Sequence, residues 1–317
     1  MRRGIVLGLL IAFGVLSLTL AGYQGQQQQR RAKVPDIYKV RENLYVIGGS
    51  QPEVRDEFTG GNTAVWITAK GVVVVDTKNP GWGQMILGKI KSVTDKPIIM
   101  VLNSHLHSDH AGSNIEFPAT VEFIAHEYIR TTWTKASCTP VANCGAFKGD
   151  NAKYLPKRTF KDKMSVLDGK DRIDLYYFGR GHTGGDTWVV FPAARVVHVG
   201  DLYRPKVLPF MDVDNGGSGV AFPETLAKGV AAITNVDNVI PGHGPVMTWD
   251  DLKTHRDFMQ DFVNYVKAAI KAGTSVDEMS RAYTVPARFR GYMEGAQGDR
   301  QRVKEDAQIV YTELQKK

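Results

Sequence analysis

The chain has 317 residues, of which 43% are hydrophobic and 23% charged, and its formal net charge is +7. This composition predicts an ordinary globular protein with a substantial core. No block of Lys and Arg with interleaved aromatic residues accompanies the basic charge, so a nucleic-acid partner is not expected. A small-molecule substrate is expected instead.

The N-terminus differs from the rest of the chain. Arg2 and Arg3 precede an apolar run over residues 5–20, which ends in small residues near Gly22. This pattern predicts a signal peptide over residues 1–22, in preference to a retained membrane anchor. We therefore expect export to the periplasm or beyond, without stable membrane insertion after cleavage. Residues 23–36 predict a flexible polar linker, and residues 37–317 a single domain with C-terminal helices.

Short apolar, β-branched runs predict strands in both halves of this domain, at residues 43–47, 63–68, 72–76, 98–102, 173–178, 187–191, 195–199 and 239–240. Apolar residues at helical spacing predict helices over residues 81–93, 221–235, 255–272 and 304–314. Strands followed by a helix thus recur in both halves, which favours two sheets between helical layers.

The two cysteines of the chain, Cys138 and Cys144, lie six positions apart in a segment with Pro and Gly. In an exported protein this spacing predicts a small loop closed by a disulfide. Metal ligation is the alternative, but no further Cys or His lies nearby in sequence.

Three histidines and an aspartate occupy the six residues from His105 to His110, directly after an apolar strand. Neutral imidazole is a frequent metal ligand, and a carboxylate adds negative charge for a divalent cation. Residues two apart in extended chain face the same way, so His105 and His107 can bind one ion. Asp109 and His110 can then address a second ion. A loop of merely solvated histidines is the alternative.

Three further signals follow the ends of apolar strands. His182 lies in the glycine-rich turn Gly179 to Gly185, Asp201 ends a strand, and His243 lies in a Pro-Gly-His-Gly segment. Strand ends gather functional residues because their loops vary while the scaffold is rigid. Taken singly, each of these segments is better explained by an ordinary turn than by a ligand.

Together, from about residue 43 to the His243 loop, these motifs resemble the metallo-β-lactamase superfamily in type and order. The resemblance implies an α/β fold of four layers, the αββα sandwich, and Asp76 as a support for the metal loop. It also implies two Zn²⁺ ions, with iron or manganese as alternatives. One ion would be bound by His105, His107 and His182, the other by Asp109, His110 and His243, and Asp201 would bridge them.

Two divalent ions about 3.5–4 Å apart can share a water and lower its pKa. The predicted activity is hydrolysis, in which a metal-bridging hydroxide attacks an ester, thioester, lactone or amide carbonyl. Asp109 or Asp201 is the candidate to accept the proton of the nucleophile and pass it to the leaving group.

The branch of the superfamily is predicted from Asp201. Class B β-lactamases generally carry Cys or a non-ligand at this position, so the site resembles those of glyoxalase II and lactonases. A metallo-β-lactamase is the alternative, and a non-catalytic metal-binding protein or an iron redox protein is the alternative from a different class. The oligomeric state is left open.

Candidate residues for substrate binding follow Asp201. Arg204 and Lys206 are predicted to hold a substrate carboxylate, with surface charge as the equal alternative. Tyr203 is considered as a donor to the leaving group, although a packed aromatic ring is favoured. Residues 48–62 predict a flap and residues 136–160 a wall of the cleft. Of the remaining histidines, His198 is expected in the core and His255 at the surface.

Overall fold

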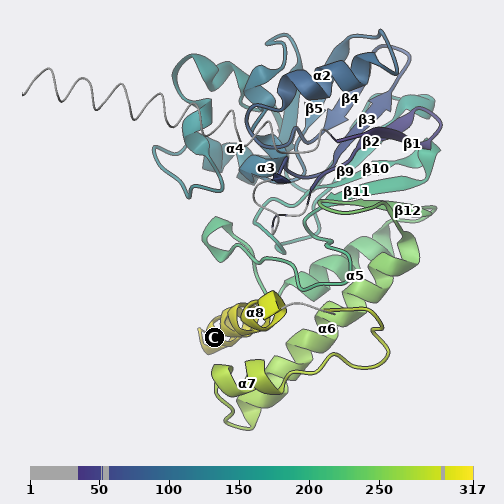
Figure 1. The fold of residues 1–317 in the computed structure, drawn as a ribbon. Coiled ribbons are helices and arrows are strands. Elements are labelled where there is room, and N and C mark those ends of the chain that lie inside the picture. The colour runs from purple at the N-terminus through teal and green to yellow at the C-terminus, as the bar shows by residue number, and fades with distance from the viewer. Residues whose placement is uncertain (1–34, 51, 53–56, 294–296, 317) are drawn as a thin grey trace, which may run out of the picture.

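A computed structural model describes residues 35–50, 52, 57–293 and 297–316. The predicted signal peptide and most of the predicted linker lie outside these residues. Two mixed sheets are packed face to face, and helices cover their outer faces (Figure 1). The order of layers is the predicted αββα sandwich.

The first sheet has seven strands in the order of the chain: β1 Ile37–Arg41, β2 Leu44–Ile47, β3 Thr63–Ile67, β4 Val72–Val75, β5 Ile98–Leu102, β6 Glu122–His126 and β7 Arg158–Phe160. The second has six, in the order β13 Met247–Thr248, β12 Asn238–Pro241, β11 Val196–Gly200, β10 Trp188–Phe191, β9 Ile173–Tyr176 and β8 Lys163–Val166. Strands β4 to β7 pair in parallel, as do β11 and β12, and the other pairs are antiparallel.

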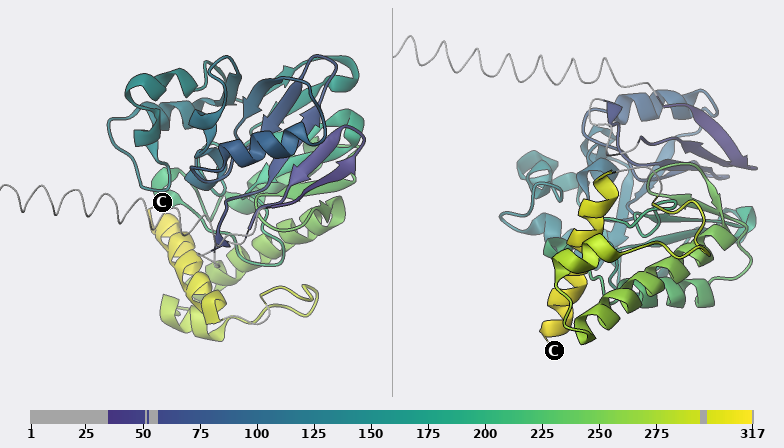
Figure 2. Two further views of the ribbon diagram at one scale, coloured as in Figure 1. Left: turned by 45° about the horizontal axis from the view of Figure 1, so that its top comes forward. Right: turned by 60° about the horizontal axis from the view of Figure 1, so that its bottom comes forward.

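The helices are α2 Gly83–Lys91, α3 Ser108–Ala111, α4 Glu127–Thr134, α5 Phe222–Ala232, α6 Trp249–Lys271, α7 Val276–Ala282 and α8 Gln297–Gln315. Short 3₁₀ helices in the described part of the chain lie at Asn114–Glu116, Cys144–Phe147, Gly149–Tyr154, Gly169–Asp171, Pro192–Ala194 and Val213–Asn215. Figure 2 shows α7 and α8 beside α6, on the outer side of the second sheet. No helix in the described part of the chain is long and apolar enough to span a membrane.

Three apolar cores hold the four layers together. On β4, Val73 and Val75 face the second sheet, whereas Val72 and Val74 face the layer of α2 and α4. A strand with both faces buried reads as a continuous apolar run, and this explains the sequence of four valines. The third core lies between the second sheet and helices α5 to α8, centred on residues such as Phe222 and Phe258.

Most predicted elements are confirmed, with differences at their edges. The predicted strands are present, but strands β1, β6, β7, β8 and β13 were not predicted, and neither were helices α3 and α7. The helix predicted over residues 255–272 begins at Trp249, because Thr248 and Asp251 form a capping box there. The surface position expected for His255 is wrong: its side chain is fully buried, with its ring centroid 4.9 Å from that of Tyr203.

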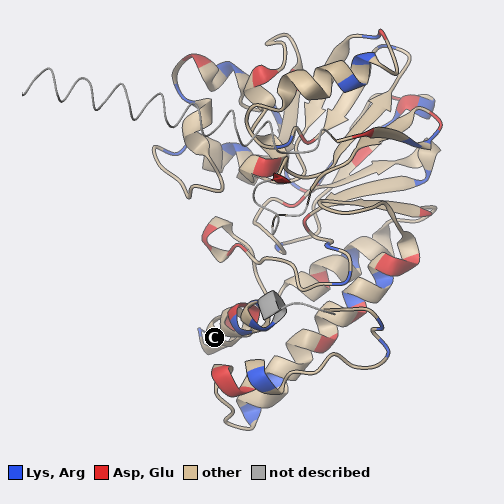
Figure 3. Ribbon diagram, viewed as in Figure 1, with Lys and Arg blue, Asp and Glu red and all other residues tan. Residues whose placement is uncertain are grey.

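Basic and acidic residues both occur along α6 and α8 (Figure 3). The seven predicted ligand residues lie elsewhere, where β5, β9, β11 and β12 end. The two sheets thus place loops from distant parts of the chain against one another at one edge of the sandwich.

Candidate metal centre

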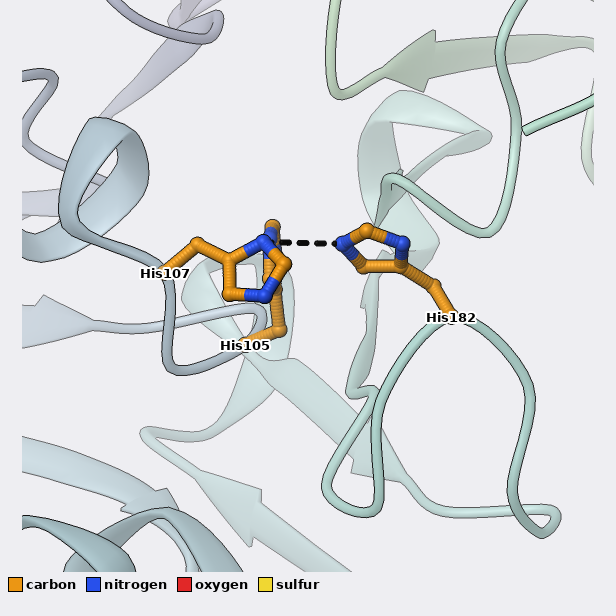
Figure 4. A group of neighbouring side chains, drawn as sticks. All are labelled: His105, His107 and His182. Atoms are coloured by element: carbon orange, nitrogen blue, oxygen red, sulfur yellow. Dashed lines mark hydrogen bonds between the residues drawn. The ribbon is translucent and has the colours of Figure 1, made fainter. Parts of the chain in front are cut away.

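His105, His107 and His182 form the first group of converging side chains. One nitrogen from each lies within 4.8 Å of the others, and all three side chains are buried. Figure 4 shows His105 and His107 coming from one loop and His182 from the turn opposite, with His107 Nδ1 3.1 Å from His182 Nε2. Nε2 of His105 is buried without a hydrogen-bond partner. A buried imidazole lone pair with no donor nearby is what a cation would satisfy.

Asp109, His110 and His243 form the second group. Oδ2 of Asp109 lies 3.1 Å from His243 Nε2 and 3.5 Å from His110 Nε2, and these two nitrogens are 3.3 Å apart. Each residue thus offers one ligand atom to a shared point, as required for a cation held by two imidazoles and a carboxylate.

Asp201 lies between the two groups. Its Oδ2 is 3.7 Å from His182 Nε2, whereas its Oδ1 is 3.3 Å from His110 Nε2 and 3.6 Å from His243 Nε2. The two oxygens of one carboxylate therefore face different groups. Gly242 makes this position possible, because a Cβ there would lie 1.7 Å from Asp201 Oδ1.

The second nitrogen of each histidine is held from outside the cluster. The acceptors are the Ser104 hydroxyl for His105, Asp212 for His107, Asp76 for His110, and the carbonyls of Phe210 and Ser50 for His182 and His243. Such a bond fixes the tautomer and the ring orientation, and it leaves the other lone pair free for a metal. The predicted support by Asp76 is extended by Ser104, whose amide and hydroxyl both donate to its carboxylate.

The charge states in the absence of a metal follow from burial and neighbours. Burial and the adjacent histidines lower the pKa of His105, and they lower that of His182 to about 4. Burial also disfavours charge on His110, but Asp109 and Asp201 outweigh it and raise its pKa. Burial is outweighed in the same way at Asp109 and Asp201, where nearby histidines lower the carboxyl pKa. Ionised carboxylates beside the neutral imidazoles of His105 and His182 suit a divalent cation, whereas His110 would have to release its proton before it bound one.

The sequence also did not predict Asp212 and Lys78 as supports of the site. Asp212 lies 2.7 Å from His107 Nε2, although 105 positions separate the two residues. Lys78 is fully buried, and its ammonium donates to the carbonyls of Ile47, Gly48 and Gly61. Neither residue lies in a motif. Only the position of Lys78, two residues after the strand-end Asp76, could have indicated a role at the site.

The predicted substrate residues are distributed differently. Tyr203 is fully buried in the core beneath the second sheet, as the packed-aromatic alternative held. Arg204 is half-buried and Lys206 exposed, and their binding role stays a prediction. The predicted flap is described only in part; within it the Phe58 ring lies 5.8 Å from that of His243. His198 is buried, as expected.

The predicted disulfide is confirmed, since Cys138 and Cys144 are bonded. They belong to the segment predicted to wall the cleft, and the Val141 carbonyl between them accepts a 2.7 Å hydrogen bond from the Ser108 amide. The segment therefore contacts the histidine motif itself.

Residues 58–248 match the family model described as the metallo-beta-lactamase superfamily, and this range includes all seven converging residues. The chain is a member of the metallo-β-lactamase superfamily. It is a metal-dependent hydrolase of the metallo-β-lactamase fold, as predicted.

Two relatives in this superfamily are similar over most of their own length. A protein of Elizabethkingia meningoseptica named metallo-beta-lactamase type 2 is 27% identical over 276 residues, which is 82% of this chain and 96% of the relative. Metallo-beta-lactamase IND-1 of Chryseobacterium indologenes is 24% identical, over 74% of this chain and 90% of its own. Both relatives carry the name of the β-lactamase alternative, and neither carries that of the glyoxalase II or lactonase branch expected from Asp201.

Solved structures share the fold. DIM-1 metallo-beta-lactamase superposes with a TM-score of 0.55 at 19% identity, covering 72% of this chain and 99% of that one. The sec-alkylsulfatase Pisa1 from a Pseudomonas species gives a TM-score of 0.64 at 15% identity, over 88% of this chain and 50% of that one. The metallo-β-lactamase fold thus extends over most of the chain.

Proposed function

We propose that this protein is a dinuclear zinc hydrolase that opens β-lactam rings. The proposal of two ions rests on the position of Asp201, because one of its carboxylate oxygens faces the first group and the other faces the second group. The substrate class is supported by the two relatives named metallo-beta-lactamases, which this chain matches over 96% and 90% of their lengths.

His105, His107 and His182 would hold one ion, Asp109, His110 and His243 the other, and Asp201 both. When bound, the ions supply a water of lowered pKa and positive charge for the oxyanion that develops at the carbonyl. The protein positions the ligands through the hydrogen bonds on their outer nitrogens. Asp109, whose side chain is 18% exposed, is the carboxylate through which a proton would pass to the leaving group.

A second candidate substrate class rests on Asp201 itself. A carboxylate in this position resembles the metal sites of glyoxalase II and lactonases, which favours thioesters or lactones. The proposed reaction at the carbonyl is the same, so the two candidates differ only in the substrate accepted by the surrounding loops.

The deciding experiment is a panel assay on the zinc-loaded protein without residues 1–22, using β-lactam, lactone, thioester and phosphodiester substrates. His107→Ala is the inactive comparison, and His126→Ala is the matched control. His126 is also buried, but it bonds to the Lys161 carbonyl and caps α4. β-Lactam turnover above the His107→Ala background supports the proposal. Turnover of thioesters or lactones alone supports the second candidate, and no turnover overturns both.

The metal and the compartment are proposed on separate grounds. Metal analysis should find two zinc ions per chain, whereas iron would favour the redox alternative. Export is supported by the N-terminal pattern and by the disulfide, since disulfides persist in oxidising compartments. Fractionation of expressing cells would test export, and an uncleaved cytoplasmic protein would contradict it.

A further inference from the structure

The disulfide-closed loop, residues 138–144, lies against the segment that carries His107. Within it, the amides of Ala142 and Asn143 both bond to the Thr139 carbonyl, and Asn143 has a left-handed backbone with φ of 45°. The Cys144 amide donates to Cys138 Sγ. The bond between the two cysteines therefore closes a compact turn.

A continuous run of hydrogen bonds leads from this loop to the first group of ligands. One amide nitrogen, Nδ2 of Asn215, donates to Thr139 Oγ1 at 2.6 Å and to Asp212 Oδ2 at 2.5 Å. The same oxygen lies 2.7 Å from His107 Nε2. Asn215, Asp212 and His107 are all at most 5% exposed, so water competes little for these bonds.

A second set of contacts ties the loop to the backbone on either side of His107. The Ser108 amide donates to the Val141 carbonyl at 2.7 Å. The Trp133 indole nitrogen lies between two carbonyls, 3.0 Å from that of Ala142 and 3.3 Å from that of Leu106. The loop thus bonds to residue 108 directly, to residue 106 through Trp133, and to the imidazole of His107 through Asn215 and Asp212.

We propose that the disulfide-closed loop positions His107 for metal binding, with Thr139 as the positioning residue and the Cys138–Cys144 bond as its brace. Asp212 selects the His107 tautomer whose Nδ1 faces His182. Asn215 needs an acceptor for its second amide hydrogen to hold Asp212 in place, and Thr139 supplies it. Without the crosslink, the loop gains conformational freedom and Thr139 loses its fixed position.

This inference rests on the proposed metal site but not on the proposed substrate. Its readout is therefore zinc affinity, measured by chelator competition on the metal-free protein as it takes up the first and second ion. If the wild type hydrolyses no β-lactam, the substrate proposal is overturned, but zinc affinity still tests the role of the loop. Failure to bind zinc would overturn both.

Thr139→Val keeps the β-branched shape and removes the acceptor oxygen. We expect the affinity of the zinc step that involves His107 to fall about 10-fold, at the lower end of the effect of outer ligand partners. The other zinc step should stay unchanged. Thr139→Ser restores a hydroxyl and should restore the affinity. The matched control is Thr134→Val, because the Thr134 hydroxyl donates to the Thr131 carbonyl within α4 and takes no part in the run of bonds to His107.

The pair Cys138→Ala with Cys144→Ala tests the brace. We expect the same selective loss, and adding Thr139→Val should then have less effect than it has in the wild type, because both changes act through one run of bonds. In the metal-free protein, the proton NMR signal of His107 Nε2–H should broaden in both variants. Unchanged affinity in Thr139→Val, or an equal loss in both zinc steps, would overturn the proposal. If the cysteine variant fails to fold, Thr139→Val and Thr139→Ser still decide it.

Discussion

Gly242→Ala is the sharpest test of the geometry around Asp201. A Cβ at residue 242 would lie 1.7 Å from Asp201 Oδ1, and real Cβ contacts essentially never fall below 3.0 Å. Gly242 has no positive φ, so the alanine backbone is not strained, and the effect is purely steric. Either the carboxylate or the loop that carries His243 has to move by far more than the tolerance of about 0.2 Å for metal–ligand distances.

We expect Gly242→Ala to lower kcat/KM about 100-fold, the cost of roughly 1 Å of misplacement at a reacting centre. Overpacking should cost about 1–3 kcal/mol of folding free energy, so the protein remains folded. Zinc content, kcat/KM and thermal unfolding measure these effects. Gly88→Ala is the control, because its added Cβ in α2 would have no atom within 4 Å apart from its chain neighbours and the backbone of its own helix. It should stabilise the protein by up to about 1 kcal/mol. A Gly242→Ala protein with two zinc ions and unchanged kcat/KM would refute the position assigned to Asp201.

Three further outcomes are expected. Asp201→Asn removes one charge from both groups and should weaken zinc binding about 10–100-fold, seen in metal analysis after dialysis; full retention of two ions would contradict bridging. The pKa of His110 is raised and those of His105 and His182 are lowered, so His110 should take up a proton first as the pH falls. The ion of the second group should therefore leave at a higher pH than the ion of the first group. Simultaneous release of both ions in a pH titration of bound zinc would count against this order. Tyr203→Phe removes a buried hydroxyl without a partner and should stabilise the protein by about 1 kcal/mol with unchanged activity; lost activity would place Tyr203 in the site after all.

The ligand residues could be predicted because residue types that bind metals occur in the sequence just after apolar strands. His105, His182 and His243 each follow an apolar strand in a short segment of recognisable type, and strand ends meet at one edge of a sheet. Their outer partners could not be predicted in the same way. Asp212 does not directly follow a strand, and its contact with His107 joins the loop between β11 and α5 to the loop after β5.

The prediction missed secondary-structure elements where the local sequence pattern was weak, and it misplaced their ends where a capping residue set the boundary. Strand β8 is short and its burial alternates only in part, because it lies at the edge of its sheet. His255 was expected at the surface of the helix predicted over residues 255–272. Its own side of α6 faces Tyr203 and the core, which helical spacing alone did not reveal.

The division of the ligand residues between the two sheets has a consequence for the stability of the protein. His105, His107, Asp109 and His110 follow a strand of one sheet, and His182, Asp201 and His243 follow strands of the other. Each bound ion would therefore crosslink the two halves of the sandwich, and the free energy of its binding would add to that of folding. The supply of metal in the surroundings then sets the resistance of the whole protein to unfolding and proteolysis, as well as its activity.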